Sequence, residues 1–445
     1  MGVVSVKDIV TNNFCTGCGA CISASDSNMI WNEEGFLVPD ITKDFADDAG
    51  KLCPFNPSPE PAVQDEDQLA KVFLKESKNS EKRIGRFENI YVGFAEDFRE
   101  NSSSGGIATY IFEQLLKNKI ADHLYIVKEV NGTYQYQWFD SVESIKLISK
   151  TRYLPVTMEN LFKEISSKEG KVAVSGVACF IKAIRLKQHY DAQFKEKIAF
   201  TAGIICGGLK SRFFTDYLAD KAGINGKYNK QQYRIKDPVS TASDYSFGAF
   251  SDDQSFHQIK MRTVGDMWGT GLFKSNACDF CDDVTTELAD ISLGDAWLSP
   301  YNKEGMGTSV IVSRSLLADE LMTEGIESGA LKCQHLALDK FLQSQEGSFK
   351  HRQLGIRYRL NLIHKKSHFV PFKRTKFFQD IPFEYRNVQR LRMKLRAASL
   401  EAWQNTKNAE AFEKEIYPVK NQLIQSTRFY HRIQKLRRIL KLKTL

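Results

Sequence analysis

Strand-like and helix-like hydrophobic patterns alternate along the middle of the chain. Short apolar runs typical of buried strands occupy residues 123–127, 171–175 and 197–205. Apolar positions recur at helical spacing over residues 107–118 and 211–223. Because strands that alternate with helices build α/β folds, this order predicts an α/β core.

Residues 233–262 break this pattern. The stretches YRIK, SFGAF and HQIKMR are short strand candidates, separated by Asp, Ser and Gly residues that favour turns. They predict a small antiparallel insertion, which is an α+β feature within the α/β core. The earlier pattern returns in ADISLGDAW, SVIVS and SLLADELMTEGI, and ends near residue 326.

The two ends of the chain differ from this core. The proline-rich stretch CPFNPSPEPA, residues 53–62, opposes regular structure, and residues 58–87 are predicted to be a linker. Beyond about residue 370 the sequence has basic helical patterns and no strand signal. A chain of 445 residues also exceeds the usual size of one hydrophobic core, so two or three structural units are expected.

The composition indicates the cellular compartment of the protein and shows where along the chain its net charge is concentrated. No uncharged apolar run reaches the roughly 18 residues that cross a bilayer, and MGVVSVKDIV lacks the basic and apolar regions of a secretory signal. A cytoplasmic location is therefore expected, where the nine cysteines are more often metal ligands, catalytic groups or core residues than disulfides. The net charge of +8 is unevenly spread: residues 371–445 have 18 Lys or Arg and 6 Asp or Glu, which is +12, and the preceding residues have 44 and 48, which is −4.

The first cysteine motif is FCTGCGACISASDSN, residues 14–28. Cys15, Cys18 and Cys21 lie at equal intervals, so three thiolates from one loop can reach three irons of a 4Fe-4S cluster. Gly17 and Gly19 reduce the steric cost of wrapping the backbone around such a cluster.

The fourth ligand of this site must come from elsewhere. In two-cluster ferredoxins the cysteine run continues after three further residues, but Ser25 stands at that position here. The next cysteine in the chain is Cys53, which precedes Pro54 as in the ferredoxin pattern. Cys15, Cys18, Cys21 and Cys53 are therefore predicted to hold one 4Fe-4S cluster. A zinc site is the alternative, although zinc knuckles usually use two CxxC pairs or histidines, and residues 1–60 contain no histidine.

Five cysteines remain. Cys179 and Cys206 each lie near the end of a predicted strand, where α/β folds carry functional loops. Cys278 and Cys281 form a CxxC pair, and Cys333 is predicted to be a core residue. Taken alone, a single cysteine at a strand end is more often a buried core residue.

Several motifs resemble one family, the beta subunits of coenzyme F420 (8-hydroxy-5-deazaflavin) hydrogenases and dehydrogenases and their bacterial relatives. The resemblance covers roughly residues 10–340. It rests on the cysteine-rich start, SSSGGIATYIFEQLL, SKTRYLPV, the segment around Cys179, GIICGG and CDFCDDVTTELADISLGDAW. It implies a second 4Fe-4S cluster, held by Cys179, Cys206, Cys278 and Cys281, and a bound FAD.

The resemblance also implies a role as an electron relay. Clusters carry single electrons, whereas hydride chemistry moves two, and a flavin can do both. The relay would take electrons from a ferredoxin or another electron-transfer protein, and its acceptor would be a deazaflavin or a small-molecule substrate. Bacterial members of the family often accompany surface-polysaccharide synthesis, which implies reduction of a sugar-linked or other metabolite.

A candidate flavin site precedes the helix predicted over residues 107–118. Ser103, Ser104, Gly105 and Gly106 would let backbone N–H groups at the helix start approach a diphosphate. The alternative is an ordinary N-cap with permissive glycines.

Other candidate flavin residues come from two further motifs. Lys150, Arg152 and Tyr153 match a family segment near the flavin, where a cation could stabilise the reduced ring, although solvated surface charges are the default for such a pattern. Asp290 and Asp295 could position or exclude a ligand, or cap loops; Asp295 is retained as a candidate cofactor-binding residue. No catalytic residue is assigned.

The sequence departs from the family around its first core cysteine. The family's Gly-Thr-Pro-Cys-Gln is Gly-Val-Ala-Cys-Phe here, residues 176–180, which keeps the cysteine and changes its neighbours. The acceptor therefore stays open between a deazaflavin and another metabolite.

The C-terminal segment STRFYHRIQKLRRILKLKTL combines charge with an apolar stripe. Phe429, Ile433, Leu436 and Leu440 recur at helical spacing among arginines and lysines. Such a helix suits peripheral contact with the inner, anionic face of the membrane. Packing on the protein's own core or on a partner is the alternative, and nucleic acid is not expected because phosphate contacts do not need an apolar stripe.

These features give a four-part organisation. A 4Fe-4S ferredoxin-type domain (1–57) and a linker (58–87) precede an FAD and 4Fe-4S core of the F420 beta-subunit type (88–345), followed by a basic helical region (346–445). The predicted function is an iron-sulfur flavoprotein oxidoreductase. The rival is a zinc-stabilised adaptor without enzymatic activity that binds membranes or partner proteins. The sequence lacks HExxH, Walker A and GxSxG motifs, so it offers no metalloprotease, NTPase or serine-hydrolase signature.

Overall fold

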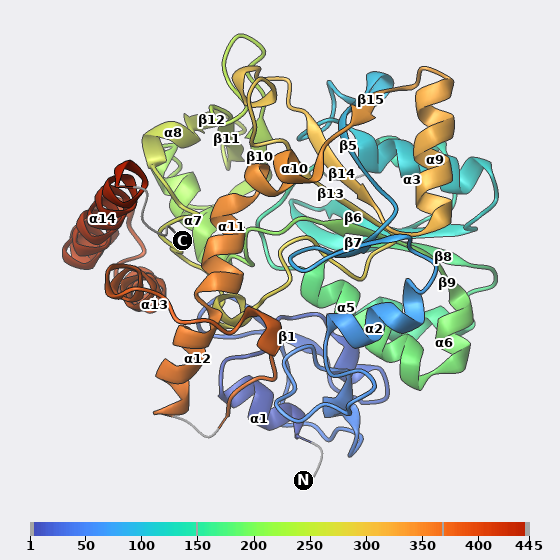
Figure 1. The fold of residues 1–445 in the computed structure, drawn as a ribbon, viewed down its shortest axis with the longest axis horizontal. Coiled ribbons are helices and arrows are strands. Elements are labelled where there is room, and N and C mark those ends of the chain that lie inside the picture. Colours follow the sequence, from blue (N-terminus) through green and yellow to red (C-terminus); the bar gives the residue numbers. More distant parts are fainter. Residues whose placement is uncertain (1–3, 148–149, 367–368, 441–445) are drawn as a thin grey trace.

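A mixed eight-stranded β-sheet forms the centre of the molecule (Figure 1). The computed structural model describes residues 4–147, 150–366 and 369–440. In spatial order the strands are β15 (Leu331–His335), β5 (Asn89–Ala95), β14 (Ser309–Ser313), β13 (Ile291–Asp295), β9 (Ile198–Ile204), β8 (Val172–Val177), β6 (His123–Val130) and β7 (Thr133–Phe139). Neighbours among β13, β9, β8 and β6 pair in parallel, and the outer pairs are antiparallel.

Side chains alternate between the two faces of the parallel strands. In β8, Val172 and Val174 enter one buried cluster, whereas Ala173 enters the cluster on the opposite face. This period of two is what a strand covered on both faces requires.

Helices cover both faces of the sheet (Figure 1). On one face, α3 (Ile107–Lys117) and α9 (Leu316–Glu327) share a hydrophobic core with the strands. The other face is covered by a larger set, which comprises α2 (Glu66–Phe73), α5 (Ala178–Tyr190), α6 (Ala192–Lys197), α10 (Leu338–Ser344) and α11 (Glu346–Phe349). The predicted alternation of strands and helices is therefore confirmed as a mixed α/β fold.

The predicted antiparallel insertion is present. Strands β10 (Tyr228–Ile235), β11 (Ser246–Ser251) and β12 (Phe256–Lys260) form a separate three-stranded antiparallel sheet. It is flanked by α7 (Arg212–Lys221) and α8 (Met261–Val264).

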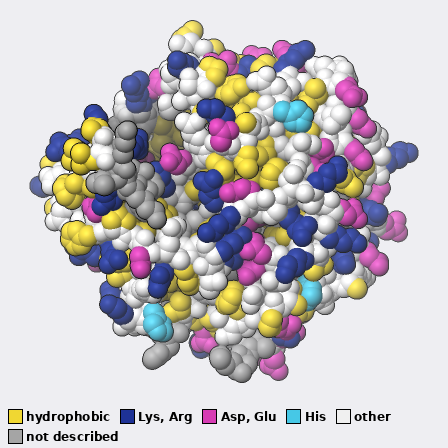
Figure 2. All heavy atoms as spheres, viewed as in Figure 1, with side chains coloured by type: hydrophobic (Ala, Val, Ile, Leu, Met, Phe, Trp, Pro, Cys, Tyr) yellow, Lys and Arg dark blue, Asp and Glu magenta, His cyan; other side chains and the backbone are white. Residues whose placement is uncertain are grey.

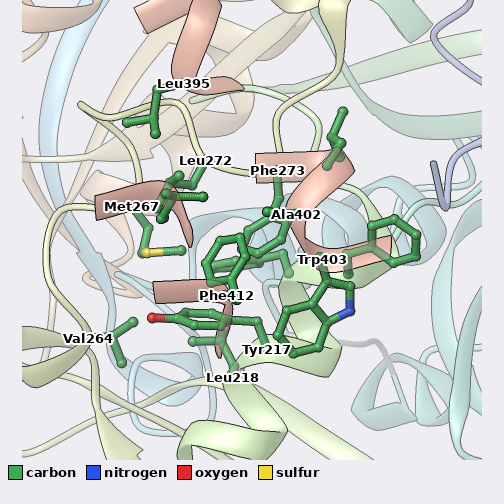
Figure 3. Close-up of a cluster of buried hydrophobic side chains, with 14 of the residues drawn as sticks. Tyr217, Leu218, Val264, Met267, Leu272, Phe273, Leu395, Ala402, Trp403 and Phe412 are labelled. Atoms are coloured by element: carbon green, nitrogen blue, oxygen red, sulfur yellow. The ribbon is translucent and has the colours of Figure 1, made fainter. Parts of the chain in front are cut away.

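The C-terminal helices pack against this insertion. After α12 (Ile356–His364), the long helices α13 (Phe383–Thr406) and α14 (Ala409–Ile439) run side by side at the left of Figure 1. Figure 3 shows Trp403 and Phe412 from these helices beside Tyr217 of α7 and Phe273. The ring centroids of Phe273 and Phe412 are 4.9 Å apart.

The N-terminal region is small and irregular. It contains α1 (Val6–Thr11), a hairpin of β1 (Met29–Trp31) and β2 (Leu37–Pro39), and two short 3-10 turns at Ala20–Ile22 and Ala49–Leu52. A short helix, α4 (Glu159–Glu164), packs on the first of these turns.

The prediction that residues 58–87 form a linker is wrong. This segment contains α2 and a second hairpin of β3 (Asn79–Glu81) and β4 (Gly85–Phe87). Asp65 caps α2 by accepting a hydrogen bond from Gln68 N–H, and Leu69 is fully buried beneath the sheet. The prolines oppose regular structure only as far as Pro61, and the capped amphipathic stretch that follows is a normal helix.

No helix within the described ranges has both the length and the apolar character needed to span a bilayer.

Candidate functional site

The first cysteine group forms around a tight loop. Gly17 and Gly19 adopt left-handed backbone conformations, with φ of 78° and 82°, as their predicted role requires. A Cβ atom on Gly19 would lie 2.8 Å from the backbone nitrogen of Glu159, so α4 closes over the loop. These constraints hold Cys15, Cys18 and Cys21 in one turn.

Cys53 lies beside these three cysteines. Burial raises the pKa of Cys21, and the nearby charges of Cys15, Cys18 and Cys53 raise it further. Backbone N–H groups point at two of the sulfurs: Gly17 donates to Cys15 Sγ at 3.4 Å, and Phe55 donates to Cys53 Sγ at 3.4 Å. Buried thiols with such donors are suited to a metal cluster, whose positive charge would offset the repulsion among thiolates.

Ser25, at the position of the absent ferredoxin cysteine, has a structural role. Its hydroxyl donates to the backbone oxygen of Asp44 at 2.6 Å and accepts from Ser27 N–H. It joins the two loops that flank the cysteine group.

The second cysteine group starts at two neighbouring strands. Val177 of β8 pairs with Ile204 of β9, and Cys179 and Cys206 each follow two residues later. Because these strands are parallel, their carboxyl ends lie at the same edge of the sheet, which brings the two cysteines together.

Cys278 and Cys281 complete this group from a 3-10 turn, Asn276–Phe280. Leu209 N–H donates to Cys278 Sγ at 3.2 Å, which ties this turn to the loop after β9. Burial raises the pKa of Cys179, and the charges of Cys278, Cys281 and Cys206 raise it further. All four predicted ligands are therefore neighbours.

Arg352 also belongs to this site, although no sequence motif pointed to it. Its Nη1 lies 3.8 Å from Cys281 Sγ and donates to the backbone oxygen of Asp283 at 2.8 Å. Burial opposes the charge on Arg352, but the charges of Cys281, Cys206 and Cys278 outweigh burial and raise its pKa. Only the fold brings the helical turn at residues 350–354 to these cysteines, so no local pattern could have identified the residue.

The two cysteine groups are adjacent in the interior. The charge of Cys18 also contributes to the raised pKa of Cys179, after the effects of burial and the three nearer thiols. The rings of Phe14, Phe55 and Phe280 form a buried cluster against which Cys53, Cys179 and Cys281 pack. Aromatic side chains thus border both groups.

Both groups supply the donor set that iron-sulfur clusters use, namely four cysteine thiols. All nine cysteines of the chain are free of disulfides. No three His, Cys, Asp or Glu side chains within the described ranges are arranged to hold a single metal ion. A four-iron cluster instead binds each thiolate at a separate iron.

A large cavity lies beside the cysteine groups. Its volume is about 1070 Å³, slightly above the usual range for ligand pockets. Seven of the eight predicted flavin residues line it: Ser103, Ser104, Gly106, Lys150, Arg152, Tyr153 and Asp295. One cysteine from each group, Cys15 and Cys206, also lines this cavity.

The segment before α3 is not an ordinary serine cap. Gly106 occupies the N-cap in a left-handed conformation, and no side chain caps the helix. Ser103 Oγ accepts a hydrogen bond from Thr151 N–H, which links this segment to the one that carries Arg152. Gly105 is not part of the cavity wall; its N–H donates to Ser309 Oγ, and a Cβ atom there would lie 2.7 Å from the backbone oxygen of Gly93.

The other predicted flavin residues lie in polar and aromatic surroundings. Lys150 is exposed, whereas burial lowers the pKa of the Arg152 guanidinium. The ring of Tyr153 makes an edge contact with Trp268 at 4.8 Å. Asp295 accepts a hydrogen bond from Arg234 at 2.6 Å.

Two residues considered from the sequence lie elsewhere. Asp290 accepts hydrogen bonds from Arg185 of α5 and from both the backbone and the hydroxyl of Thr201 of β9, so it joins that helix to the sheet. Cys333 lies on the edge strand β15, half-buried and apart from both cysteine groups.

Family models match much of the chain. Residues 90–163 match the N-terminal part of the beta subunit of coenzyme F420 hydrogenase/dehydrogenase, and residues 169–338 match its C-terminal part. Together the two matches cover more than half of the chain.

Curated relatives agree with these matches. The chain is 23% identical to the beta subunit of coenzyme F420 hydrogenase of Methanosarcina barkeri, over 59% of this chain and 90% of that protein. It is 25% identical to one subunit of the F(420)H(2) dehydrogenase of Methanosarcina mazei, over 49% of this chain and 61% of that protein. For the coenzyme F420 hydrogenase beta subunit of Methanococcus voltae the identity is 26%, over 42% of this chain and 65% of that protein. The match thus spans less than two thirds of the length of the latter two proteins.

A solved structure shares the fold. A chain of the F420-reducing NiFe hydrogenase complex of Methanosarcina barkeri, solved with xenon, superposes with a TM-score of 0.50 at 18% identity. The superposition covers 66% of this chain and 98% of that one. Hydrogenases and dehydrogenases are oxidoreductases, so the predicted enzyme class agrees with that of the relatives. The predicted family is confirmed: the chain belongs to the family of coenzyme F420 hydrogenase/dehydrogenase beta subunits.

Proposed function

We propose that the chain is an iron-sulfur flavoprotein oxidoreductase. It relays single electrons from a ferredoxin-like donor, through two 4Fe-4S clusters and FAD, to an acceptor that takes two. One observation carries this proposal: the cavity lined by the candidate flavin residues is also lined by Cys15 and Cys206, one from each cysteine group.

The chain's own residues prepare each site. Cys15, Cys18, Cys21 and Cys53 would hold the entry cluster, and Cys179, Cys206, Cys278 and Cys281 would hold the second. Backbone N–H groups and Arg352 point toward sulfurs, which stabilises negative charge on them. The Phe14, Phe55 and Phe280 rings exclude water between the groups.

The cavity offers the contacts that FAD needs. FAD, when bound, exchanges electrons either singly or in pairs. The N-terminus of α3 and its small residues would approach the diphosphate, and Arg152 and Tyr153 of the cavity wall would contact the ring system.

The acceptor belongs either to the deazaflavins or to another class of metabolite, such as a sugar-linked intermediate in polysaccharide synthesis. Phe180, at the position of the family's glutamine, lines the cavity, and its ring stacks on that of Tyr136 at 6.5 Å. An apolar ring in place of an amide removes a hydrogen-bonding group and favours a different acceptor.

An anaerobic reductive titration tests this function. Protein purified without oxygen is titrated with dithionite while the cluster and flavin absorbances are recorded. About four electrons per chain are expected, one for each cluster and two for FAD. A colourless protein that takes up no electrons and contains zinc would favour the rival adaptor.

We also propose that α14 makes peripheral contact with an anionic membrane. Phe429, Leu436 and Leu440 of the predicted stripe are more than half exposed, although α14 buries its other face against α13. Figure 2 shows hydrophobic and basic side chains side by side over this part of the molecule. Exposed arginines at 428, 432 and 438 flank the stripe, which suits the surface of an anionic bilayer.

A further inference from the structure

Arg234 enters the cavity from the antiparallel insertion and is held in one orientation. It lies on β10, is only 8% exposed, and lines the cavity. Its Nη1 donates to Asp295 at 2.6 Å. The rings of Tyr245 and Trp297 lie against its guanidinium, with centroids at 4.8 and 5.9 Å. The side chain is therefore positioned before any ligand arrives.

One edge of this guanidinium has no partner. Arg234 Nε is buried, and no described residue accepts a hydrogen bond from it. A buried charged donor left unpaired costs free energy, and native proteins usually satisfy such groups. Nε itself is closed to solvent, so a ligand can reach Arg234 only through the part of its side chain that lines the cavity.

Positive charge around Arg234 favours an anionic ligand. The cavity is lined by Lys150, Arg152, Lys210, Arg234 and Arg262, but by only two acidic residues, Asp266 and Asp295. Nearby, Lys236 donates to the backbone oxygen of Ser104 at 2.8 Å. Burial lowers the pKa of Lys236 to about 7, and the charges of Arg99, Arg234 and Lys150 contribute to this shift. An anion would relieve this repulsion.

We propose that Arg234 binds an anionic oxygen, from a carboxylate or phosphoryl group, on the two-electron acceptor. The inference rests on the proposed function, which places an acceptor in this cavity. A reversible acceptor must enter from solvent, and the wall beside Arg234 is open there: Trp297 is 39% exposed, and Thr241 is exposed. The antiparallel insertion, which supplies Arg234 and Tyr245, is then the element that selects the acceptor.

Anion binding to the FAD-loaded protein tests this role. Inorganic phosphate is titrated by calorimetry in a phosphate-free buffer at constant ionic strength, and FAD affinity of the apoprotein is measured separately. Arg234→Gln is expected to weaken phosphate binding at least tenfold and to leave FAD affinity within twofold. Lys230→Gln removes one charge from an exposed position on the same strand and is expected to change neither.

Three results would overturn the inference. The first is that phosphate does not bind to the native chain, and the second is that Arg234→Gln binds phosphate as tightly as the native chain does. The third is a tenfold loss of FAD affinity in Arg234→Gln, which would mean that Arg234 binds the flavin and not the acceptor. If Arg234→Gln does not fold, Asp295→Asn replaces it: removing the competing carboxylate should tighten phosphate binding, and weaker binding would contradict the proposal. A chain that binds phosphate through Arg234 but no FAD would refute the proposed function alone.

Discussion

Cys53 is the residue that completes the first cysteine group. It lies 32 residues after Cys21 in the sequence, yet its charge contributes to the raised pKa of Cys21. The sequence identified it because a ferredoxin-type site needs a fourth thiol and Cys53 is the next cysteine before a proline.

Substituting Cys53 should remove one cluster and leave the other. In Cys53→Ser, iron is expected to fall from about eight to about four atoms per chain, because a cubane needs its four thiolate ligands. Iron analysis of anaerobically purified protein measures this. Cys333→Ser is the matched control, since Cys333 lies apart from both groups, and its iron content should equal that of the native chain. Equal iron in Cys53→Ser and the native chain would exclude Cys53 as a ligand.

Single residues that act across the fold could not be predicted. Arg352 reaches Cys281, and Arg234 reaches Asp295, across 71 and 61 positions of sequence. Neither arginine stands in a motif, because the contact is created by packing of separate elements. The grouping of Cys15, Cys18, Cys21 and Cys53 was predicted from their spacing, whereas that of the other four came from the family resemblance.

At the scale of elements, α14 presents two different faces. Phe412, Ile416, Leu423 and Tyr430 are buried, and the ring of Tyr430 stacks on Tyr385 of α13 at 4.7 Å. The stripe predicted from the sequence lies mostly on the opposite, exposed face. Core packing therefore explains one set of apolar residues and leaves the other available for a surface.

Membrane contact through this exposed face can be tested without unfolding the helix. A triple variant should reduce co-sedimentation with phosphatidylglycerol vesicles several-fold, because its apolar side chains no longer insert while its charge is unchanged. It combines Phe429→Ser, Leu436→Ser and Leu440→Ser. Tyr417→Ser, an exposed residue earlier on α14, should bind as the native chain does. Equal sedimentation of the triple variant would show that the stripe is not the anchor.

A buried arginine joins α2 to the C-terminal region. The side chain of Arg374 is 1% exposed and contacts Glu287 at 2.7 Å, Asp282 at 3.0 Å and Glu66 of α2 at 3.5 Å. Lys182 of α5 pairs with the same Glu66 at 3.1 Å. This network explains why residues 58–87 are fixed to the core and do not act as a linker.

Removing Arg374 should be strongly destabilising. In Arg374→Met three carboxylates lose their shared partner in a buried setting, so the free energy of unfolding is expected to fall by about 3–5 kcal/mol. Urea denaturation followed by circular dichroism measures the change. Arg357→Met, which breaks the exposed pair with Asp380, should cost no more than about 1 kcal/mol. A similar loss in both variants would mean that the network does not hold the segments together.

For the whole molecule, local patterns predicted the class of fold but not its assembly. The strands at residues 123–127, 171–175 and 197–205 became β6, β8 and β9, since apolar runs of that length bury well in a parallel sheet. The order of the strands depends on long-range pairing, such as β5 between β14 and β15, which periodicity does not encode. The cavity depends on the same pairing, because its wall joins segments from Cys15 to Ser348.

The central claim is that eight thiols hold two iron-sulfur clusters next to a flavin cavity. The most direct measurement is the iron, acid-labile sulfide, zinc and flavin content of the anaerobically purified native chain. The account predicts about eight irons, about eight sulfides and one FAD per chain, without zinc. One or two zinc ions per chain, with neither sulfide nor flavin, would contradict it.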